Sequence, residues 1–306
     1  MKQKLSNVYT LPLGEIVEKH NVSRMFFADD GNLYLGFRQN KVDPAKASME
    51  DLARDLKYFF VENDLMSNDD KLIAMVINGT RREPIIFPPL SVGNVEVPIS
   101  LSARMLGAHL DSTMSMSEQV NKVSQMCYLQ LHKLYKIRKC INEEAAKTLV
   151  HTLITSRLDY CNALLYGIPN VLMDKLWCVQ KASARLITNT GKYDHITPVL
   201  IDLHMLPMNH RVQYKILLLT YKSLKGLSPV YLTELLQPRK NKGTRRDNMN
   251  LLVEPRFKYV TYGGRSFSRA APVLWNRLPQ FIRDSADLTV FKTSLKTHLF
   301  KKAFNL

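Results

Sequence analysis

The sequence predicts an α+β fold, in which a mixed N-terminal part is followed by a mainly helical part. Two short apolar runs flank Asp29, Asp30 and Gly31, a pattern typical of a β-hairpin. After Asp111, apolar residues recur at helical spacing along most of the chain. The 306 residues suffice for two or three modest domains.

The hairpin is the first element expected, with strands over 22–27 and 33–37 and a turn over 29–32. A helix is expected next. Ser48, with Asp51 three residues later, resembles a capping box, and apolar residues then mark one helix face to about residue 63.

Short strands are expected in the rest of the N-terminal part. Residues 72–77 are a continuous apolar run that favours a buried strand, and 103–110 favour another. Four prolines make 80–100 a loop with at most short edge strands.

Helices are expected along most of the chain from residue 113 onwards. Ser115 with Glu118, Asn142 and Asn170 are the start signals of three long helices. Further helices are expected to start near Asp194, Asn209 and Ser228, and a final one to span about 285–303. Residues 238–266 have few periodic apolar positions and many arginines and lysines, which predicts a basic loop.

The positive charge lies in the helical part. The whole chain has a net charge of +16, but residues 1–112 hold 13 Lys/Arg against 15 Asp/Glu, and residues 113–306 hold 30 against 12. Such a field attracts phosphate backbones, so nucleic acid is a plausible partner. A solvated cationic surface without a specific partner is the alternative.

The spacing of the cysteines and the length of the apolar runs exclude several classes of protein. The four cysteines form no Cys-x-x-Cys pair, which argues against a zinc site and favours reduced core cysteines. No apolar run approaches the ~20 residues of a spanning helix, and residues 1–16 lack the apolar stretch of a secretory leader. We therefore expect an intracellular protein, cytoplasmic or nuclear, without a membrane partner.

The adjacent carboxylates Asp29 and Asp30 are the candidate metal ligands. Mg²⁺ prefers hard oxygen ligands, and a polymerase holds its metal on acids at the tip of a hairpin. Taken alone, Asp-Gly and Asp-Asn between apolar runs is more often ordinary turn chemistry.

A long ordered series of motifs resembles the reverse transcriptases of non-LTR retrotransposons. It covers almost the whole chain and includes Phe-Ala-Asp-Asp at 27–30, Asn-Asp-Asp-Lys at 68–71, Leu-Gly at 106–107, Ser-Arg-Leu-Asp-Tyr-Cys-Asn at 156–162, Tyr-Gly-Ile-Pro at 166–169, His-Ile-Thr-Pro at 195–198, Leu-His-Met-Leu-Pro at 203–207 and Ala-Pro-Val-Leu-Trp-Asn at 271–276.

The resemblance implies three regions and a set of catalytic residues. Residues 1–112 would be part of a polymerase palm, 113–237 a helical thumb and 238–306 a basic loop with a helical extension. Asp29 would ligate Mg²⁺ with Asp30 in support, and Lys71 would lie near the triphosphate or pyrophosphate. Lys71 could equally be an exposed lysine in a turn.

The resemblance also implies that the catalytic site is incomplete. In the family, a strand with a second metal-binding Asp precedes residue 1, so this chain resembles the C-terminal part of a longer polymerase. We therefore expect no primer extension from residues 1–306 alone; a Mg²⁺-dependent product that is lost on Asp29→Ala would contradict this. Phe27, Gly31 and Leu72-Ile73 depart from the family pattern, which fits a drifting copy.

Nucleic-acid contacts are expected in two places, with an RNA template and a DNA primer as partners. Leu106-Gly107 would form the turn that presses on the primer, unless it is a glycine bulge in a strand. The basic residues of the helical part would contact phosphates; these are Lys133, Lys136, Arg138, Lys139, Lys181 and Arg185. The rival functions are a non-catalytic nucleic-acid-binding protein and a helical protein-interaction module.

Overall fold

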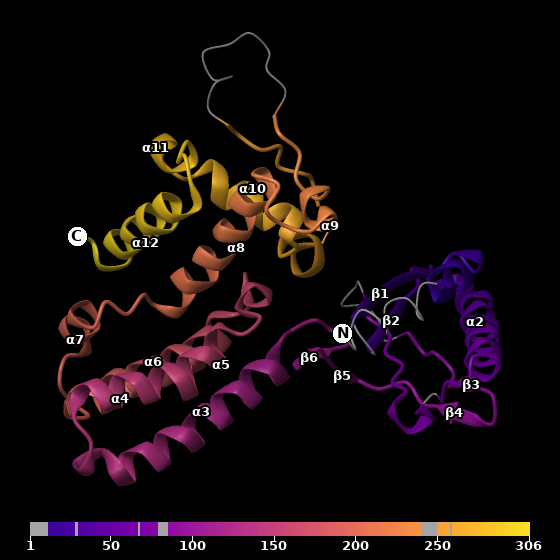
Figure 1. The fold of residues 1–306 in the computed structure, drawn as a ribbon, viewed down its shortest axis with the longest axis horizontal. Helices are drawn as coiled ribbons and strands as arrows, with labels where there is room; N and C mark the ends of the chain where they lie inside the picture. Colours follow the sequence, from indigo (N-terminus) through magenta and orange to yellow (C-terminus); the bar gives the residue numbers. More distant parts are fainter. Residues whose placement is uncertain (1–11, 28–29, 67, 79–84, 240–249, 258) are drawn as a thin grey trace. The chain divides into compact units, whose positions relative to one another are not determined.

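The computed structural model describes residues 12–27, 30–66, 68–78, 85–239, 250–257 and 259–306 (Figure 1). The fold is mixed α+β, about 59% helical with small antiparallel sheets. The chain divides into two compact units, Met1–Thr113 and Met114–Leu306, which we describe separately.

A hairpin of β1 (Ser23–Phe27) and β2 (Asp30–Tyr34) opens the N-terminal unit after helical residues 12–19. The predicted hairpin is confirmed, but its turn was placed too late, because Asp30 already pairs with Phe27 and Gly31 with Phe26. Asn32 likewise pairs with Met25, so Asp30, Gly31 and Asn32 belong to β2 rather than to the turn.

Helix α2 (Val42–Glu62) packs behind the hairpin, preceded by the 3₁₀ turn η1 (Gln39–Lys41). Leu52 of α2 joins Val17 and Val22 in the core of this unit. The helix starts six residues before the predicted cap, because Pro44 fits its first turn. Ser48 is an interior residue, whose hydroxyl donates to the His20 carbonyl at 3.3 Å.

Two further hairpins complete the unit. Strands β3 (Leu90–Val92) and β4 (Val95–Val97) form one, within the predicted loop. Strands β5 (Ser102–Met105) and β6 (Ala108–Asp111) form the other, where one strand was predicted. The buried strand predicted at 72–77 is wrong: after the 3₁₀ turn η2 (Asp69–Lys71), this run makes one bridge, Ala74 with Ile99, and Ile73 is 57% exposed.

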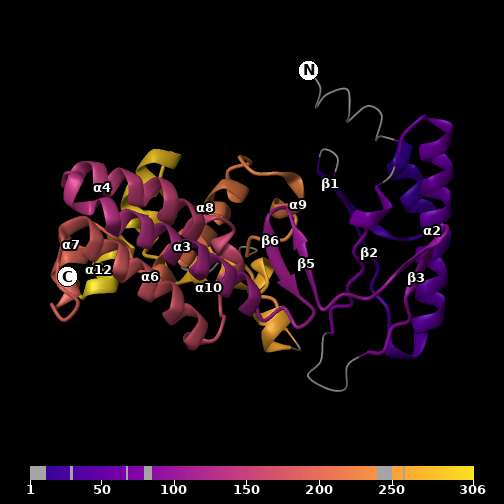
Figure 2. The same cartoon turned by 90° about the horizontal axis from the view of Figure 1, so that it is seen from below.

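Three long helical segments begin the second unit, as predicted. Helix α3 (Ser117–Ile137) runs into the turn η3 (Arg138–Cys140), and Figures 1 and 2 show it alongside α6 (Asn170–Thr188). Between them, α4 (Glu143–Val150), η4 (His151–Thr155) and α5 (Ser156–Asp159) make one continuous helical segment. The Asn142 side chain caps it by accepting from the Ala145 amide at 2.8 Å.

The middle of this segment, η4, is a π-turn. Thr152 and Ser156 donate their hydroxyls to carbonyls four residues back, to Thr148 at 2.7 Å and to Thr152 at 2.5 Å. Such bonds compete with the regular helical pattern. The 3₁₀ turn η5 (Asn162–Leu165) follows after Cys161, which has a positive φ.

The rest of the unit consists of shorter helices around α8. These are α7 (Ile196–Asp202), α8 (Met208–Leu224), α9 (Val230–Thr233), the π-turn η6 (Val260–Gly264), α10 (Phe267–Asn276), α11 (Gln280–Arg283) and α12 (Leu288–Phe304). Helices α10 and α11 were not predicted, whereas α12 was. Phe291 stacks on Tyr221 in the core, and Trp275 lies tilted against it, so helices of the C-terminal region share one interior with α8.

Candidate nucleic-acid interface

The carboxylate hairpin presents one described acid on an exposed face. Asp29 lies outside the described residues. Asp30 is exposed opposite Phe27, on the face that also carries Met25 and Tyr34, because directly paired residues share a face. Its carboxylate is a hard ligand of the kind that Mg²⁺ prefers. In the part of the chain that the structure describes, no group of three or more His, Cys, Asp or Glu could hold a metal ion.

Lys71 ends the turn η2 and is exposed. Its neighbour Asp69 pairs with Lys57 at 2.7 Å, which ties the turn to α2. No ion pair joins Asp30 to Lys71 among the described residues. Both predicted residues are thus solvent-exposed in the same unit.

Leu106 and Gly107 form the two-residue turn between β5 and β6. Their φ angles are 47° and 82°, and a turn with both φ positive matches the twist of a hairpin. The predicted tight turn is confirmed, and the alternative of a glycine bulge inside one strand is wrong. Gly107 carries its positive φ without steric cost, whereas Leu106 is strained.

Lys133, Lys136 and Lys139 gather near the C-terminal end of α3. All three are exposed, and no hydrogen bond or ion pair of these lysines is found within the described ranges. Tyr135 lies beside them and donates its hydroxyl to the Ala182 carbonyl at 3.3 Å; burial raises its pKa. We call Lys133, Lys136 and Lys139 the α3 lysine cluster.

Arg138 lies between Lys136 and Lys139 in the sequence, but its side chain is bonded to the fold. Its guanidinium donates to the carbonyls of Leu186 and Ile187 at 2.7 Å each, at the end of α6, and to Ile141 at 2.8 Å. These carbonyls lack helical partners, and a cation at a helix C-terminus is favourable. Arg138 thus joins α3 to α6, with three of its donors committed to the fold.

Arg185 and Lys181 lie on α6. Arg185 donates to the carbonyls of Gly191 and Asp194 at 3.0 and 3.1 Å, so it fixes the loop that follows the helix. The Lys181 ammonium stands 5.7 Å from the Trp177 ring centroid and keeps its donors for solvent or a ligand. Of the six predicted phosphate contacts, four lysines therefore remain available.

Comparisons with models of protein families, with curated proteins and with solved structures gave no match for this chain. The functional argument therefore depends on residues and their geometry.

Cysteine chemistry has little part in the interface. All four cysteines are free thiols. Burial raises the pKa of the Cys127 thiol to about 11, so it stays protonated as an apolar core group. The prediction of core cysteines holds for Cys127 but is wrong for Cys140 and Cys178, which are exposed. No described helix is both long and apolar enough to cross a bilayer.

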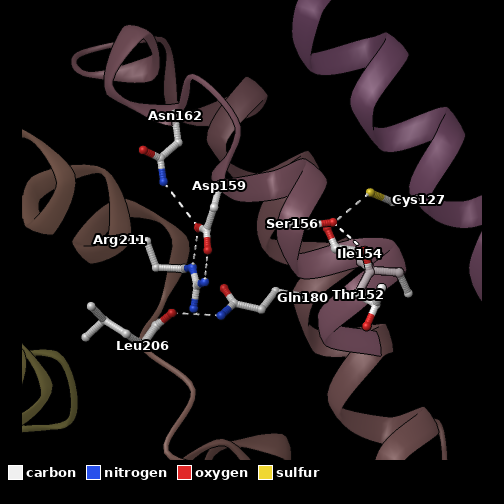
Figure 3. A network of polar contacts seen from close by, with 9 residues as sticks. All are labelled: Cys127, Thr152, Ile154, Ser156, Asp159, Asn162, Gln180, Leu206 and Arg211. Carbon is white, nitrogen blue, oxygen red and sulfur yellow. Dashed lines mark hydrogen bonds and ion pairs between the residues drawn. The ribbon is translucent and has the colours of Figure 1, made fainter. Parts of the chain in front are cut away.

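A polar network that the sequence did not predict holds α5, η5 and α8 together (Figure 3). Arg211 binds both carboxylate oxygens of Asp159, and the Asn162 amide donates to the same carboxylate at 3.2 Å. Nearby, the Gln180 amide donates to the Leu206 carbonyl at 2.7 Å. The signal in the sequence was Asp159, the acidic residue of the Ser-Arg-Leu-Asp motif.

Three histidines of this unit have pKa values below the ordinary 6.5. Burial is the main cause for His151, His210 and His298, and nearby cations add to it. Lys302 is the cation beside both His210 and His298. For His151 the raising effect of Asp159 is outweighed by Arg211, Lys147 and Lys296.

We expect the thermal midpoint of the helical unit to fall as pH is lowered from about 7 to 5. A histidine with a lowered folded pKa binds fewer protons in the folded than in the unfolded state, so stability rises with pH there and is lost on acidification. Thermal unfolding followed by circular dichroism tests this. The combined variant His151→Gln, His210→Gln, His298→Gln should flatten the dependence, and an unchanged slope would contradict the assignment.

Proposed function

We propose that the chain acts in RNA-directed DNA synthesis, as part of a reverse transcriptase of the non-LTR retrotransposon kind. The N-terminal unit would be part of the palm, and the second unit would be the thumb with its extension. The observation that carries this proposal is the pair of hairpins in motif order. One hairpin bears Asp30 of the Ala-Asp-Asp sequence, and the other turns at Leu106-Gly107.

The proposed chemistry is nucleotidyl transfer. Asp29 and Asp30 would hold Mg²⁺, which in such reactions activates the attacking hydroxyl and neutralises the phosphates. The exposed ammonium of Lys71 would interact with the triphosphate. The exposed face of the hairpin, with Met25, Phe27 and Tyr34 beside Asp30, leaves this carboxylate accessible to a nucleic-acid end.

The second unit would hold the template–primer through its phosphates. Its 30 Lys/Arg against 12 Asp/Glu give the long-range attraction, and the α3 lysine cluster offers ammonium groups without protein partners within the described ranges. Contacts of lysine with phosphate position a duplex without reading its sequence.

The variant Lys133→Glu, Lys136→Glu, Lys139→Glu should weaken binding of an RNA template annealed to a DNA primer. Each lysine that contacts a phosphate contributes about one unit to the slope of log K against log salt. We therefore expect the slope to become shallower by about three. Fluorescence anisotropy of the labelled hybrid at several salt concentrations measures it.

A matched control is the variant Lys19→Glu, Arg38→Glu, Lys41→Glu, which makes the same charge change on exposed residues of the other unit. Its slope should stay closer to that of the unchanged protein. An equal loss in both variants would show that net charge alone drives binding, and would refute the specific role of the α3 lysine cluster.

The second candidate function is a non-catalytic nucleic-acid-binding protein, favoured by the concentration of positive charge in the helical unit. Binding does not separate it from the first. Mg²⁺-dependent extension of a primed RNA template does, when it is measured with the chain joined to a preceding palm segment that carries the second metal-binding Asp, since residues 1–306 alone are expected to be inactive. Product that is lost on Asp29→Ala favours the polymerase. A flat salt dependence would favour a protein-interaction module instead.

A further inference from the structure

We infer that α8 and α12 form a second phosphate-binding surface, separate from the α3 lysine cluster, and that it takes the backbone of the same nucleic acid. This inference rests on the proposed function, since it extends nucleic-acid binding to a further part of the helical unit. We define the surface by His210 of α8 and by Lys296, His298 and Lys302 of α12, and call it the α8/α12 surface.

Neither helix carries a carboxylate. The 17 residues of α8 include His210, Arg211, Lys215 and Lys222 with no Asp or Glu. The 17 residues of α12 include four lysines and His298, again with no Asp or Glu. The helices pack against each other, and Figure 1 shows the C-terminal end of α12 near the end of α8 that follows α7. The positive charges of the two helices are therefore not neutralised by acidic residues of the same helices.

In the described part of the chain, no anion acts on His210 or His298, whereas Asp159 partly offsets the cations around His151. Lys302 interacts electrostatically with His210 and with His298, and Lys296 interacts with His151 of the neighbouring π-turn. Arg211 is the exception, because Asp159 neutralises it. A folded chain that collects like charges at one place lowers its own stability, and a bound polyanion removes that cost.

The surface has the form that suits a phosphate backbone rather than a lipid bilayer or an apolar protein partner. Lys296 and Lys302 lie six residues apart on α12, about 9 Å along the helix axis, which is the spacing of two or three phosphates of one strand. Membrane-surface helices need exposed apolar side chains as anchors. Val290 in the first turn of α12 is 48% exposed, but no other large hydrophobic side chain of α8 or α12 is strongly exposed in the described structure.

Binding at this surface should be coupled to proton uptake. The groups that face the histidines are Lys302 for His210 and His298, and Lys147, Arg211, Asp159 and Lys296 for His151. A phosphate beside His210 or His298 offsets the repulsion by Lys302 and favours the protonated imidazole. Affinity should then rise several-fold as pH falls from about 8 to 5.5.

The test measures anisotropy of the full chain with the primed RNA hybrid, across salt and pH. We expect Lys296→Glu, Lys302→Glu to make the salt slope shallower by about two. The control variant Lys225→Glu, Arg277→Glu makes the same charge change on exposed residues of the same unit and should have a smaller effect. The variant His210→Gln, His298→Gln should lose most of the gain in affinity between pH 8 and pH 5.5, measured relative to its own affinity at pH 8.

Three results would overturn the inference. The first is an equal loss for the α12 variant and its control, and the second is a pH dependence that survives in the histidine variant. The third is a preference for phosphatidylserine vesicles over the hybrid. If the α3 lysine variant loses affinity while the α12 variant does not, this inference fails and the proposed function stands. If the unchanged protein does not bind the hybrid, both fail.

Discussion

Replacing Phe291 by alanine is expected to destabilise the helical unit by about 3–5 kcal/mol, the usual cost of removing a large buried aromatic side chain. Its ring is fully buried, stacks on Tyr221 at a centroid distance of 4.1 Å, and meets Trp275 at 6.0 Å. Urea denaturation followed by circular dichroism measures the free energy of unfolding.

Phe281→Ala is the matched control, because it removes the same side chain from a position that is 71% exposed. It should change the free energy of unfolding by less than about 0.5 kcal/mol. A similar loss in both variants would mean that Phe291 is not the centre of this core. The comparison also tests whether the C-terminal helices belong to the same cooperative unit as α8.

Arg211→Ala is expected to cost about 2–3 kcal/mol, less than the loss of a fully buried ion pair, since the Asp159 side chain is 40% exposed. Removing the guanidinium leaves Asp159 at the C-terminal end of α5, where the helix dipole disfavours a negative charge. Urea denaturation of the variant gives the loss.

Lys175→Ala is the control for this variant. Lys175 donates to the Asn121 side chain at 2.8 Å, but both residues are exposed, so its removal should cost less than about 1 kcal/mol. If Arg211→Ala costs no more than this control, the network of Figure 3 does not hold α5 to α8.

Local sequence signals predicted the helical elements well and the short strands poorly. Asn142 marked the start of α4, whereas Asp287, which caps α12 by accepting from the amides of Thr289 and Val290, was not among the predicted caps. Residues 72–77 were apolar enough for a buried strand but found no continuous partner. A strand needs such pairing, and the sequence of one strand does not specify it.

Helix α10 was missed for a different reason. Pro272 lies inside it, and proline removes a backbone donor and disfavours a helix interior. Burial of Ala271, Leu274 and Trp275 in the core outweighs this cost. Local helix propensity does not include the stability that such tertiary packing adds.

The candidate site could be predicted in kind but not residue by residue. The sequence places Arg138 beside Lys136 and Lys139 as equivalent basic residues, yet only the fold shows that its donors serve the end of α6. No binding role was predicted for the lysines and His298 of α12, because such a role depends on the packing of α8 against this helix.

The most direct test of the account is the salt dependence of binding between the chain and an RNA template annealed to a DNA primer. We expect log K to fall linearly and steeply with log salt. The slope should be shallower for Lys133→Glu, Lys136→Glu, Lys139→Glu. Weak binding that does not depend on salt would contradict the claim that this helical unit holds nucleic acid. A triple variant that binds like the unchanged protein would contradict the role of the α3 lysine cluster in that binding.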